Sequence, residues 1–134
     1  MTAKKSSRKN KATSTLDEQT FRLMFEGHSV VMLFIESQTG VILDANQAAV
    51  NFYNYSKSKL CGMSINEIST LPPGQAVAEE RQKALNNERN YSIFSHRLAS
   101  GEERVVEVYS SPIALQEKQA LFLIIHDVTE RNRV

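Results

Sequence analysis

Apolar residues near the start of the chain recur at helical spacing. Thr15-Leu-Asp-Glu18 has the form of a capping box, in which a hydroxyl and a carboxylate each accept a hydrogen bond from a backbone amide of the first turn. The pattern predicts an amphipathic helix over residues 15–27, ending at a glycine. Its apolar stripe is formed by Phe21, Met24, Phe25 and His28.

The next segment consists of β-branched and aromatic runs separated by turn residues. Residues 30–35 form the first run, the sequence SQTG at 37–40 favours a turn, and residues 41–45 form the second run. We therefore predict a β-hairpin. Asn46 directly follows it and has a side chain suited to cap a short helix.

Short helices are predicted for the middle of the chain. Ser64-Ile-Asn-Glu67 is a second capping box, and two prolines at 72 and 73 prevent that helix from continuing. Residues 75–87 follow as the longest predicted helix, in which Glu79 and Lys83 form an i, i+4 pair of opposite charge.

Three strands are predicted for the last third of the chain, at residues 91–99, 104–115 and 121–126. With the hairpin they make five strands, and the simplest closure is an α+β domain. We expect a five-stranded antiparallel sheet with short helices packed on one face and an N-terminal amphipathic helix.

The apolar pattern also predicts a register for the first of these hairpins. Phe94 and Leu98 should share a face with Val106 and Val108, because a slip of one residue would expose apolar side chains to water. This matching leaves a three-residue loop, Ser100-Gly101-Glu102, with the glycine in the left-handed conformation.

Charge divides the chain into a basic tail and one acidic domain. Residues 1–14 carry five basic side chains and no acidic one, and the remainder carries eleven basic and fifteen acidic side chains. We expect the tail to be disordered and solvated, and the domain, residues 15–131, not to bind nucleic acid.

Targeting signals and metal motifs are not predicted. The opening residues contain no apolar run, so we expect neither a signal peptide nor a membrane span. A single cysteine, Cys61, excludes an internal disulfide and a cysteine-rich zinc site, which favours a reducing, cytoplasmic setting and no bound metal.

Four segments of the chain, in order, resemble the PAS/PAC sensory family. They are GVILDANQAAVNFYNYS, SKSKLCGMSINEI, FSHRLASGEERVVEVYSSPI and HDVTER, and the likeness covers roughly residues 18–131. The resemblance implies the sheet predicted above and a sensory input module of a bacterial signalling protein. Such modules precede output domains, here expected to be a diguanylate cyclase or a histidine kinase.

The sequence does not predict an enzyme. His28, His96 and His126 fall on three separate predicted elements, and no hydrolase triad or HExxH spacing joins them. Histidines scattered in this way are structural far more often than catalytic.

The resemblance also argues against two cofactors. Flavin-binding relatives carry a reactive cysteine three residues after the glycine that corresponds to Gly62, and here that residue is Ile65. Haem-binding relatives commonly use a histidine on the long helix, which has none between residues 75 and 87. Neither haem nor a cysteinyl flavin is therefore expected.

A pocket for an unidentified small molecule is predicted between the helices and the sheet. His96 lies between apolar neighbours there, and it is either a core histidine paired with a hydroxyl or carbonyl, or a ligand contact and pH-sensitive group. The candidate pocket residues, which also admit a plain core role, are Phe52, Tyr53, Tyr55, Met63, Phe94, His96, Leu98 and Ser110.

The end of the chain is the predicted exit for a signal. Asp127-Val-Thr-Glu130 is a third capping box, followed by Arg131, and the helix it opens is too short by residue 134 to be stable alone. We expect residues 127–134 to begin a connector helix, with Asp127 as the hinge between sensing and output and with Thr129, Glu130 and Arg131 also at the signal exit. The alternative is that this segment only ends the fold.

An alternative function is a dimerisation module that binds no ligand. The stripe of the first helix would then pair with a second copy of the chain. We expect the sheet face without short helices to carry Leu33, Ile35, Leu123 and Ile125. This face would be covered by the first helix or by the same helix of a second copy of the chain.

Overall fold

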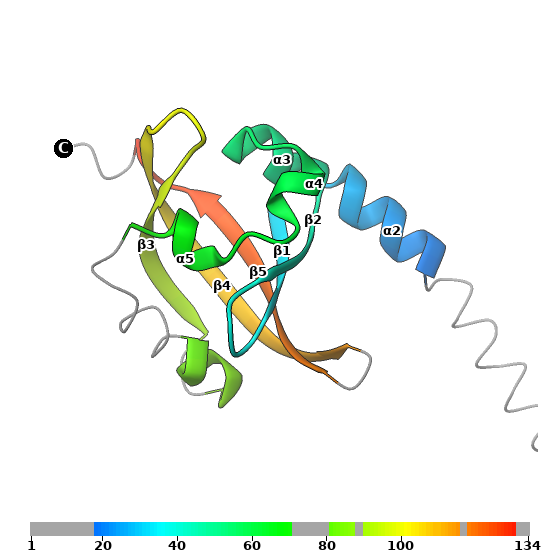
Figure 1. Cartoon of the computed structure of the whole chain (residues 1–134). Helices are drawn as coiled ribbons and strands as arrows, with labels where there is room; N and C mark the ends of the chain where they lie inside the picture. The colour runs from blue at the N-terminus through cyan, green and yellow to red at the C-terminus, as the bar shows by residue number, and fades with distance from the viewer. Residues whose placement is uncertain (1–17, 71–80, 88–89, 116–117, 131–134) are drawn as a thin grey trace, which may run out of the picture.

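A computed structural model describes residues 18–70, 81–87, 90–115 and 118–130. Its centre is a five-stranded antiparallel sheet in the order β2-β1-β5-β4-β3, crossed on one face by short helices (Figure 1). This is the α+β fold predicted from the sequence. The elements are α2 (Glu18–Gly27), β1 (Val31–Glu36), β2 (Ile42–Ala45), α3 (Gln47–Tyr53), α4 (Lys57–Leu60), α5 (Ile65–Ile68), β3 (Tyr91–Arg97), β4 (Glu103–Leu115) and β5 (Lys118–Asp127).

The first hairpin forms where the apolar runs predict it. A turn joins β1 to β2, and the carboxylate of Glu36 accepts hydrogen bonds from the amides of Gln38 (3.1 Å) and Thr39 (2.7 Å). Gly40 has a φ of 75°, a left-handed conformation that glycine adopts without strain. Local turn chemistry therefore sets this hairpin.

Caps set the starts of the short helices. The Asn46 side chain accepts a hydrogen bond from the amide of Ala49, and Ser64 and Glu67 form the predicted capping box of α5. Of the long helix predicted at 75–87, the structure describes the part from residue 81 onward, and residues 81–85 are helical. The capping box at Thr15 and the partner Glu79 lie outside the described residues.

The predicted register of β3 and β4 is wrong by two residues. Arg97 pairs with Glu103, and the amide of Leu98 still donates to the carbonyl of Glu102 (2.8 Å), so the three-residue loop spans residues 99–101 instead of 100–102. The amide of Ala99 donates to the carbonyl of Tyr53 (2.8 Å) instead of to β4. Because side chains alternate with a period of two, this shift keeps the faces as predicted, and Gly101 has the predicted left-handed φ of 94°.

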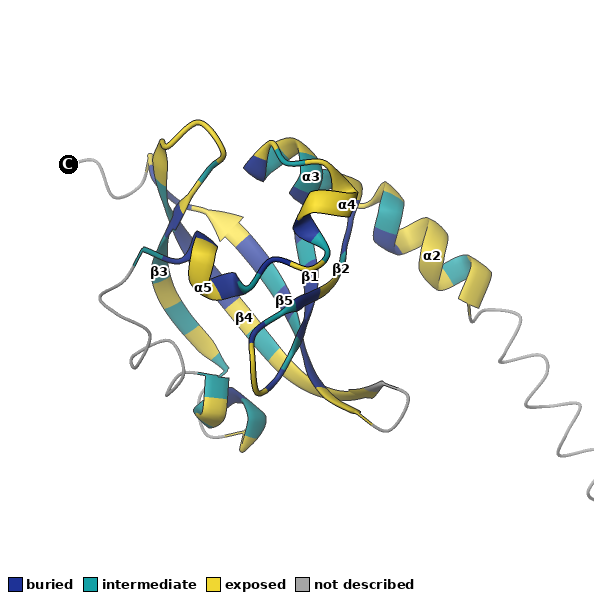
Figure 2. Cartoon of the chain, in the orientation of Figure 1, coloured by how far each residue is buried: buried dark blue, intermediate teal, exposed yellow. Residues whose placement is uncertain are grey.

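The sequence prediction of which side chains of β1 and β5 face the short helices is wrong. Leu33, Ile35, Leu123 and Ile125 lie in the core between the sheet and the short helices, not on the opposite face. By alternation that face, here called the outer face, carries the neighbours of these residues, such as Phe34 and Phe122. Along residues 121–125 of β5, buried residues alternate with partly exposed ones (Figure 2).

Helix α2 covers part of the outer face. The ring of Phe25 lies 5.5 Å from that of Phe34, which in turn lies 4.9 Å from Phe122. Phe21 stacks on Phe25 at 5.7 Å and remains partly exposed. Phe21 and Phe25 of the predicted apolar stripe therefore pack against the sheet of their own domain.

The segment between β2 and β3 is hydrogen-bonded to both edges of the sheet. At the β2 edge, the amide of Ile42 donates to the carbonyl of Met63 (2.7 Å). At the β3 edge, the amide of Thr70 donates to the carbonyl of Ser95 (2.8 Å). The helical layer thus crosses the sheet and is fixed at each side.

Among the described residues, no helix has the length and apolar character needed to cross a membrane.

Candidate functional site

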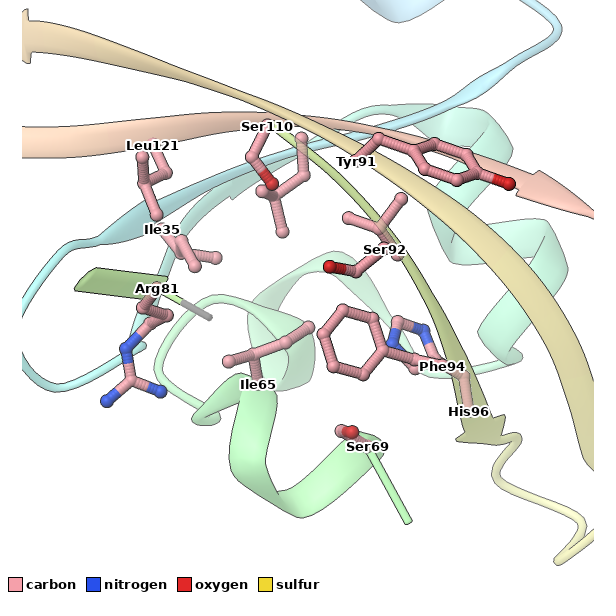
Figure 3. A pocket seen from close by; sticks show the side chains of 12 residues that line it. Ile35, Ile65, Ser69, Arg81, Tyr91, Ser92, Phe94, His96, Ser110 and Leu121 are labelled. Atoms are coloured by element: carbon pink, nitrogen blue, oxygen red, sulfur yellow. The ribbon is translucent and has the colours of Figure 1, made fainter. Parts of the chain in front are cut away.

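A small cavity lies between the sheet and α5 (Figure 3). Its volume is about 40 Å³, counted as space for the centres of water-sized spheres, which is room for a few water molecules or a small ligand. Most of the lining is apolar, with a few polar groups among it. The lining residues are Ile35, Ile65, Ser69, Arg81, Tyr91, Ser92, Phe94, His96, Val108, Ser110, Leu121 and Leu123.

Strand alternation explains why β3 and β4 contribute these side chains. Ser92, Phe94 and His96 occupy every second position of β3 and face the short helices. Ser92 pairs with Val108 across the ladder, and Ser110 lies two residues farther along β4. The hydroxyls of Ser92 and Ser110 therefore lie over the same cavity (Figure 3).

Ser69 contributes a buried hydroxyl. It follows α5, is 9% exposed, and its Oγ has no hydrogen-bond partner among the residues that the structure describes. Buried hydroxyls are normally paired, and leaving one unpaired costs about 1–3 kcal/mol. An unpaired hydroxyl beside a cavity is a position where a ligand or a water molecule gains a hydrogen bond.

His96 forms the polar end of the cavity and pairs with a tyrosine behind it. Its Nδ1 lies 2.8 Å from the hydroxyl of Tyr53, and both side chains are fully buried. Burial lowers the pKa of His96 from 6.5 to about 3 and raises the pKa of Tyr53. Both side chains are therefore neutral at pH 7, and the predicted pairing of His96 with a hydroxyl is found.

Arg81 lies at the other side of the cavity in Figure 3. Its guanidinium donates to the carbonyls of Ser37 (3.2 Å) and Gln38 (3.1 Å) and to the side-chain oxygen of Asn66 (3.1 Å). Burial lowers the pKa of Arg81, and the charge of Glu36 opposes that change. The cation is thus held by neutral acceptors.

The predicted pocket residues divide into two groups. Phe94, His96 and Ser110 line the cavity. Tyr53 stands behind His96, and the remaining predicted residues are packed in or against the core away from the cavity. These are Phe52, Tyr55, Met63 and Leu98.

Sequence reasoning missed Ser69, Ser92 and Arg81. Ser92 could have been found, because it continues the alternation of Phe94 and His96 on the same strand. Ser69 and Arg81 reach the cavity through the path of the chain between β2 and β3, for which the sequence gives no signal.

A second, more open groove lies near the C-terminal end of β5. It has a volume of about 750 Å³ on the same measure, and its walls include Phe52, His28 and Asp127. The sequence predicts a pocket role for Phe52, a place on the dimer helix for His28 and a signal-exit role for Asp127. The structure brings them to one groove.

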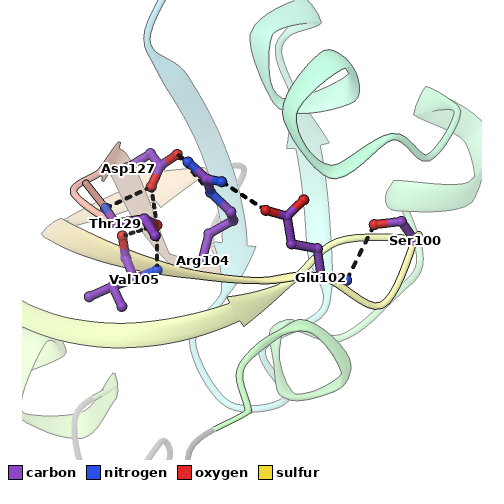
Figure 4. Close-up of polar contacts among 6 residues, drawn as sticks. All are labelled: Ser100, Glu102, Arg104, Val105, Asp127 and Thr129. Carbon is purple, nitrogen blue, oxygen red and sulfur yellow. Dashed lines mark hydrogen bonds and ion pairs between the residues drawn. The ribbon is translucent and has the colours of Figure 1, made fainter. Parts of the chain in front are cut away.

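A charged cluster fixes the C-terminal end of β5 (Figure 4). Oδ2 of Asp127 accepts hydrogen bonds from Nε (3.0 Å) and a terminal nitrogen (2.6 Å) of Arg104, which also donates to Glu102 (2.8 Å). Oδ1 accepts from the amide (3.0 Å) and hydroxyl (2.6 Å) of Thr129. The Thr129 hydroxyl in turn accepts from the amide of Val105 (2.9 Å).

These contacts decide the charge of Asp127. Burial raises the pKa of its carboxyl, but hydrogen bonds from Thr129 and Arg104 outweigh burial, so the pKa is lowered overall. Of the other predicted exit residues, Glu130 is exposed and Arg131 lies outside the described residues. The expected connector helix stays a prediction.

The cavity and the charged cluster meet on one pair of residues. His96 of β3 pairs with Arg104 of β4 across the ladder. His96 lines the cavity, and Arg104 holds Asp127. A single step across the sheet therefore separates the cavity from the end of β5.

Two residues, Cys61 and Ile65, bear on the expectation that the domain binds no cysteinyl flavin. Ile65 lines the cavity. Burial, followed by the charge of Asp44, raises the pKa of the Cys61 thiol and favours its unreactive form. Within the described ranges, no group of three or more histidine, cysteine, aspartate or glutamate side chains is arranged to hold a metal ion.

Comparisons with known proteins agree on one family and one fold. A family model described as "PAS fold" matches residues 27–133. The PAS domain of an HTR-like protein from Haloarcula marismortui superposes with a TM-score of 0.73 at 20% identity, covering 92% of this chain and 98% of that one. A PAS domain from Colwellia psychrerythraea gives a TM-score of 0.74 at 20% identity, covering 84% and 98%.

A curated relative is closer in sequence but much longer. Diguanylate cyclase DgcM of Escherichia coli K12 is 34% identical over 111 residues, which are 82% of this chain and 27% of the relative. The chain thus spans about a quarter of that protein.

Proposed function

The chain belongs to the PAS fold family, and on this basis we propose that it senses a small molecule in the cavity and relays the signal through Asp127 to a C-terminal output domain. A PAS domain is a sensory module and not a catalytic one. The observation that supports this proposal most is the pairing of His96 with Arg104, because it joins the cavity to the charged cluster at the exit.

We propose a diguanylate cyclase as the output domain in preference to a histidine kinase. The support is the sequence relationship to DgcM, which covers most of this chain. We further propose that the ligand is not a cysteinyl flavin, since Ile65 at the cavity cannot form a thiol adduct and Cys61 does not line it. We also propose that it is not haem, since residues 75–87, the predicted long helix, contain no histidine.

Filling the cavity tests the sensory role. We expect Ser110→Phe to abolish the response of the full-length protein to its signal, because the added ring occupies the space for the ligand. Overpacking should cost about 1–3 kcal/mol of stability and leave the domain folded. The readout is cyclic diguanylate production by the full-length protein with and without cell extract.

Ser111→Phe is the matched control. Ser111 is the next residue of β4, is exposed, and faces away from the cavity. It should keep the response. A normal response in a folded Ser110→Phe variant would overturn the sensory proposal.

Dimerisation is a second candidate function, favoured by exposed apolar side chains. On α2, Leu23 is 75% and Met24 62% exposed, and on the outer face Ile93 is 51% and Tyr109 45% exposed. The polar side of α2 is held to its own domain, since Lys57 contacts both Glu26 (2.6 Å) and Asp44 (3.3 Å). Phe25 packs on Phe34 of the same chain, whereas Leu23 and Met24 have no such cover and are available to a second copy of the chain.

Light scattering at micromolar concentration tests this proposal. We expect a dimer for the chain as it is, and a shift toward monomer for Met24→Lys, because a charge would be buried at the interface. Lys59→Gln, on the exposed side of α4, should leave the mass unchanged. A strict monomer would contradict the dimerisation proposal.

A further inference from the structure

The polar side chains around the cavity can all donate hydrogen bonds, although the serine hydroxyls can also accept them. They are Arg81, three serine hydroxyls and His96, while the hydroxyl of Tyr91 is already donated to Glu107 (2.7 Å). No carboxylate or carboxamide side chain is among the described residues that line the cavity. The lining therefore complements a ligand that accepts hydrogen bonds.

His96 contributes a donor because of its partner. The buried hydroxyl of Tyr53 has His96 as its single partner in the described part of the chain. If Nδ1 carried the proton, the tyrosine proton would be buried without an acceptor. Tyr53 therefore donates to Nδ1, which assigns the proton of the neutral ring to Nε2, the nitrogen without a hydrogen bond to a described residue.

Arg81 adds a positive charge that no acidic side chain of the described residues contacts, although the charge of Glu36 acts on it. Its three hydrogen bonds go to two carbonyls and one carboxamide, which leaves two of its five N–H groups unused. No carboxylate of the described residues forms an ion pair with it. A cation with spare donors at the edge of an otherwise apolar cavity favours an anion.

We propose that the ligand is a small organic acid, with its carboxylate toward Arg81 and an apolar body among Ile35, Phe94 and Leu121. The unpaired hydroxyl of Ser69 supplies a further donor inside the cavity. This inference rests on the proposed function, in which the cavity binds the signal molecule. It adds the charge and the chemical class of that molecule.

Pairs of acids and their neutral amides test the charge. Butanoate with butanamide, and benzoate with benzamide, match each other in shape and differ in charge. Titration of the ¹⁵N-labelled chain, followed by amide chemical shifts of residues at the cavity, gives each dissociation constant. We expect at least one acid to bind about tenfold more tightly than its amide, the effect of one hydrogen bond to a charged group.

Variants then assign the preference to Arg81. Arg81→Gln should reduce the ratio of acid to amide affinity to about one, Arg81→Lys should retain part of it, and Lys59→Gln should retain all of it. Thermal unfolding checks that each variant is folded. If Arg81→Gln does not fold, the ratios of acid to amide affinity for the unmodified chain and for Arg81→Lys still test the proposal.

The outcomes separate this inference from the proposed function. Equal binding of acid and amide, or a preference that persists in Arg81→Gln, overturns the organic acid and leaves a sensor for a neutral ligand. Absence of any binding overturns the organic acid as well. If Ser110→Phe in the full-length protein then leaves its response intact, the sensory function fails with it.

Discussion

Acidification below pH 6.5 is expected to destabilise the domain by up to about 1.4 kcal/mol per pH unit through His96 alone. The unfolded chain takes up a proton on this residue near pH 6.5, and the folded chain only near pH 3. Between these values the unfolded state binds more protons, so the free energy of unfolding rises with pH. The contribution of His96 is complete above pH 6.5 and is lost as the pH falls.

Urea unfolding at a series of pH values measures this effect, with Tyr53→Phe/His96→Leu as the matched control. The double variant replaces both partners by apolar groups and so leaves neither one unpaired. Its slope between pH 6.5 and about pH 5 should be smaller than that of the parent chain, since most carboxylates remain ionised there. The charged groups nearest the pair include Arg104, opposite His96, and it stays charged throughout. Equal slopes would show that His96 does not titrate as a buried group.

Asn46→Ala is expected to cost about 3 kcal/mol or more of the free energy of unfolding. The Asn46 side chain is fully buried and accepts hydrogen bonds from the amides of Met32 (3.0 Å) and Ala49 (3.0 Å). It also donates to the carbonyl of Val30 (2.8 Å). The substitution removes a helix cap and leaves two backbone groups of the β1 segment without a partner. For a domain of ordinary stability, about 5–15 kcal/mol, this is a large fraction.

Ser56→Ala provides the comparison. Ser56 caps α4 with one hydrogen bond, from the amide of Lys59 (3.2 Å), and it is exposed. Its loss should cost about 0.5–1 kcal/mol. If Asn46→Ala costs no more than Ser56→Ala in the same urea experiment, the bonds from Asn46 to β1 add nothing to stability.

Local signals predicted the elements well, because caps and turns depend on few neighbours. Asn46 was recognised as a cap from its position after a strand. The hydrogen bonds of its side chain to Met32 and Val30 were not predicted, because they depend on how β1 lies beside the start of α3. The same limit applies to Tyr53, whose partner His96 is distant in sequence.

The faces of the central strands could not be read from the sequence. In the runs VMLFI and LFLII, apolar side chains occupy both odd and even positions, so alternation assigns neither set to the core. Both sets are apolar because α2 covers the outer face near Phe34. For Phe94 in β3 the prediction was right, and Phe94 shares the core face with its partner Val106.

The register of β3 and β4 shows a second limit. A shift of two residues changes no face, and the apolar pattern therefore cannot detect it. The competing contact, between the amide of Ala99 and the carbonyl of Tyr53, joins segments far apart in the chain. In the site, the same reason explains why Phe94 and His96 were found and Arg81 was not.

The attachment of the helical layer to both edges of the sheet limits how other proteins can associate with this domain. Exposed strand edges serve as templates for strands of other chains and so promote aggregation and strand addition. Here Met63 occupies a hydrogen-bonding position at the free edge of β2, and Thr70 occupies one at the free edge of β3. At these positions a foreign strand finds its hydrogen bonds already taken. Strand addition at these positions would therefore first require the helical layer to detach from the edge of the sheet.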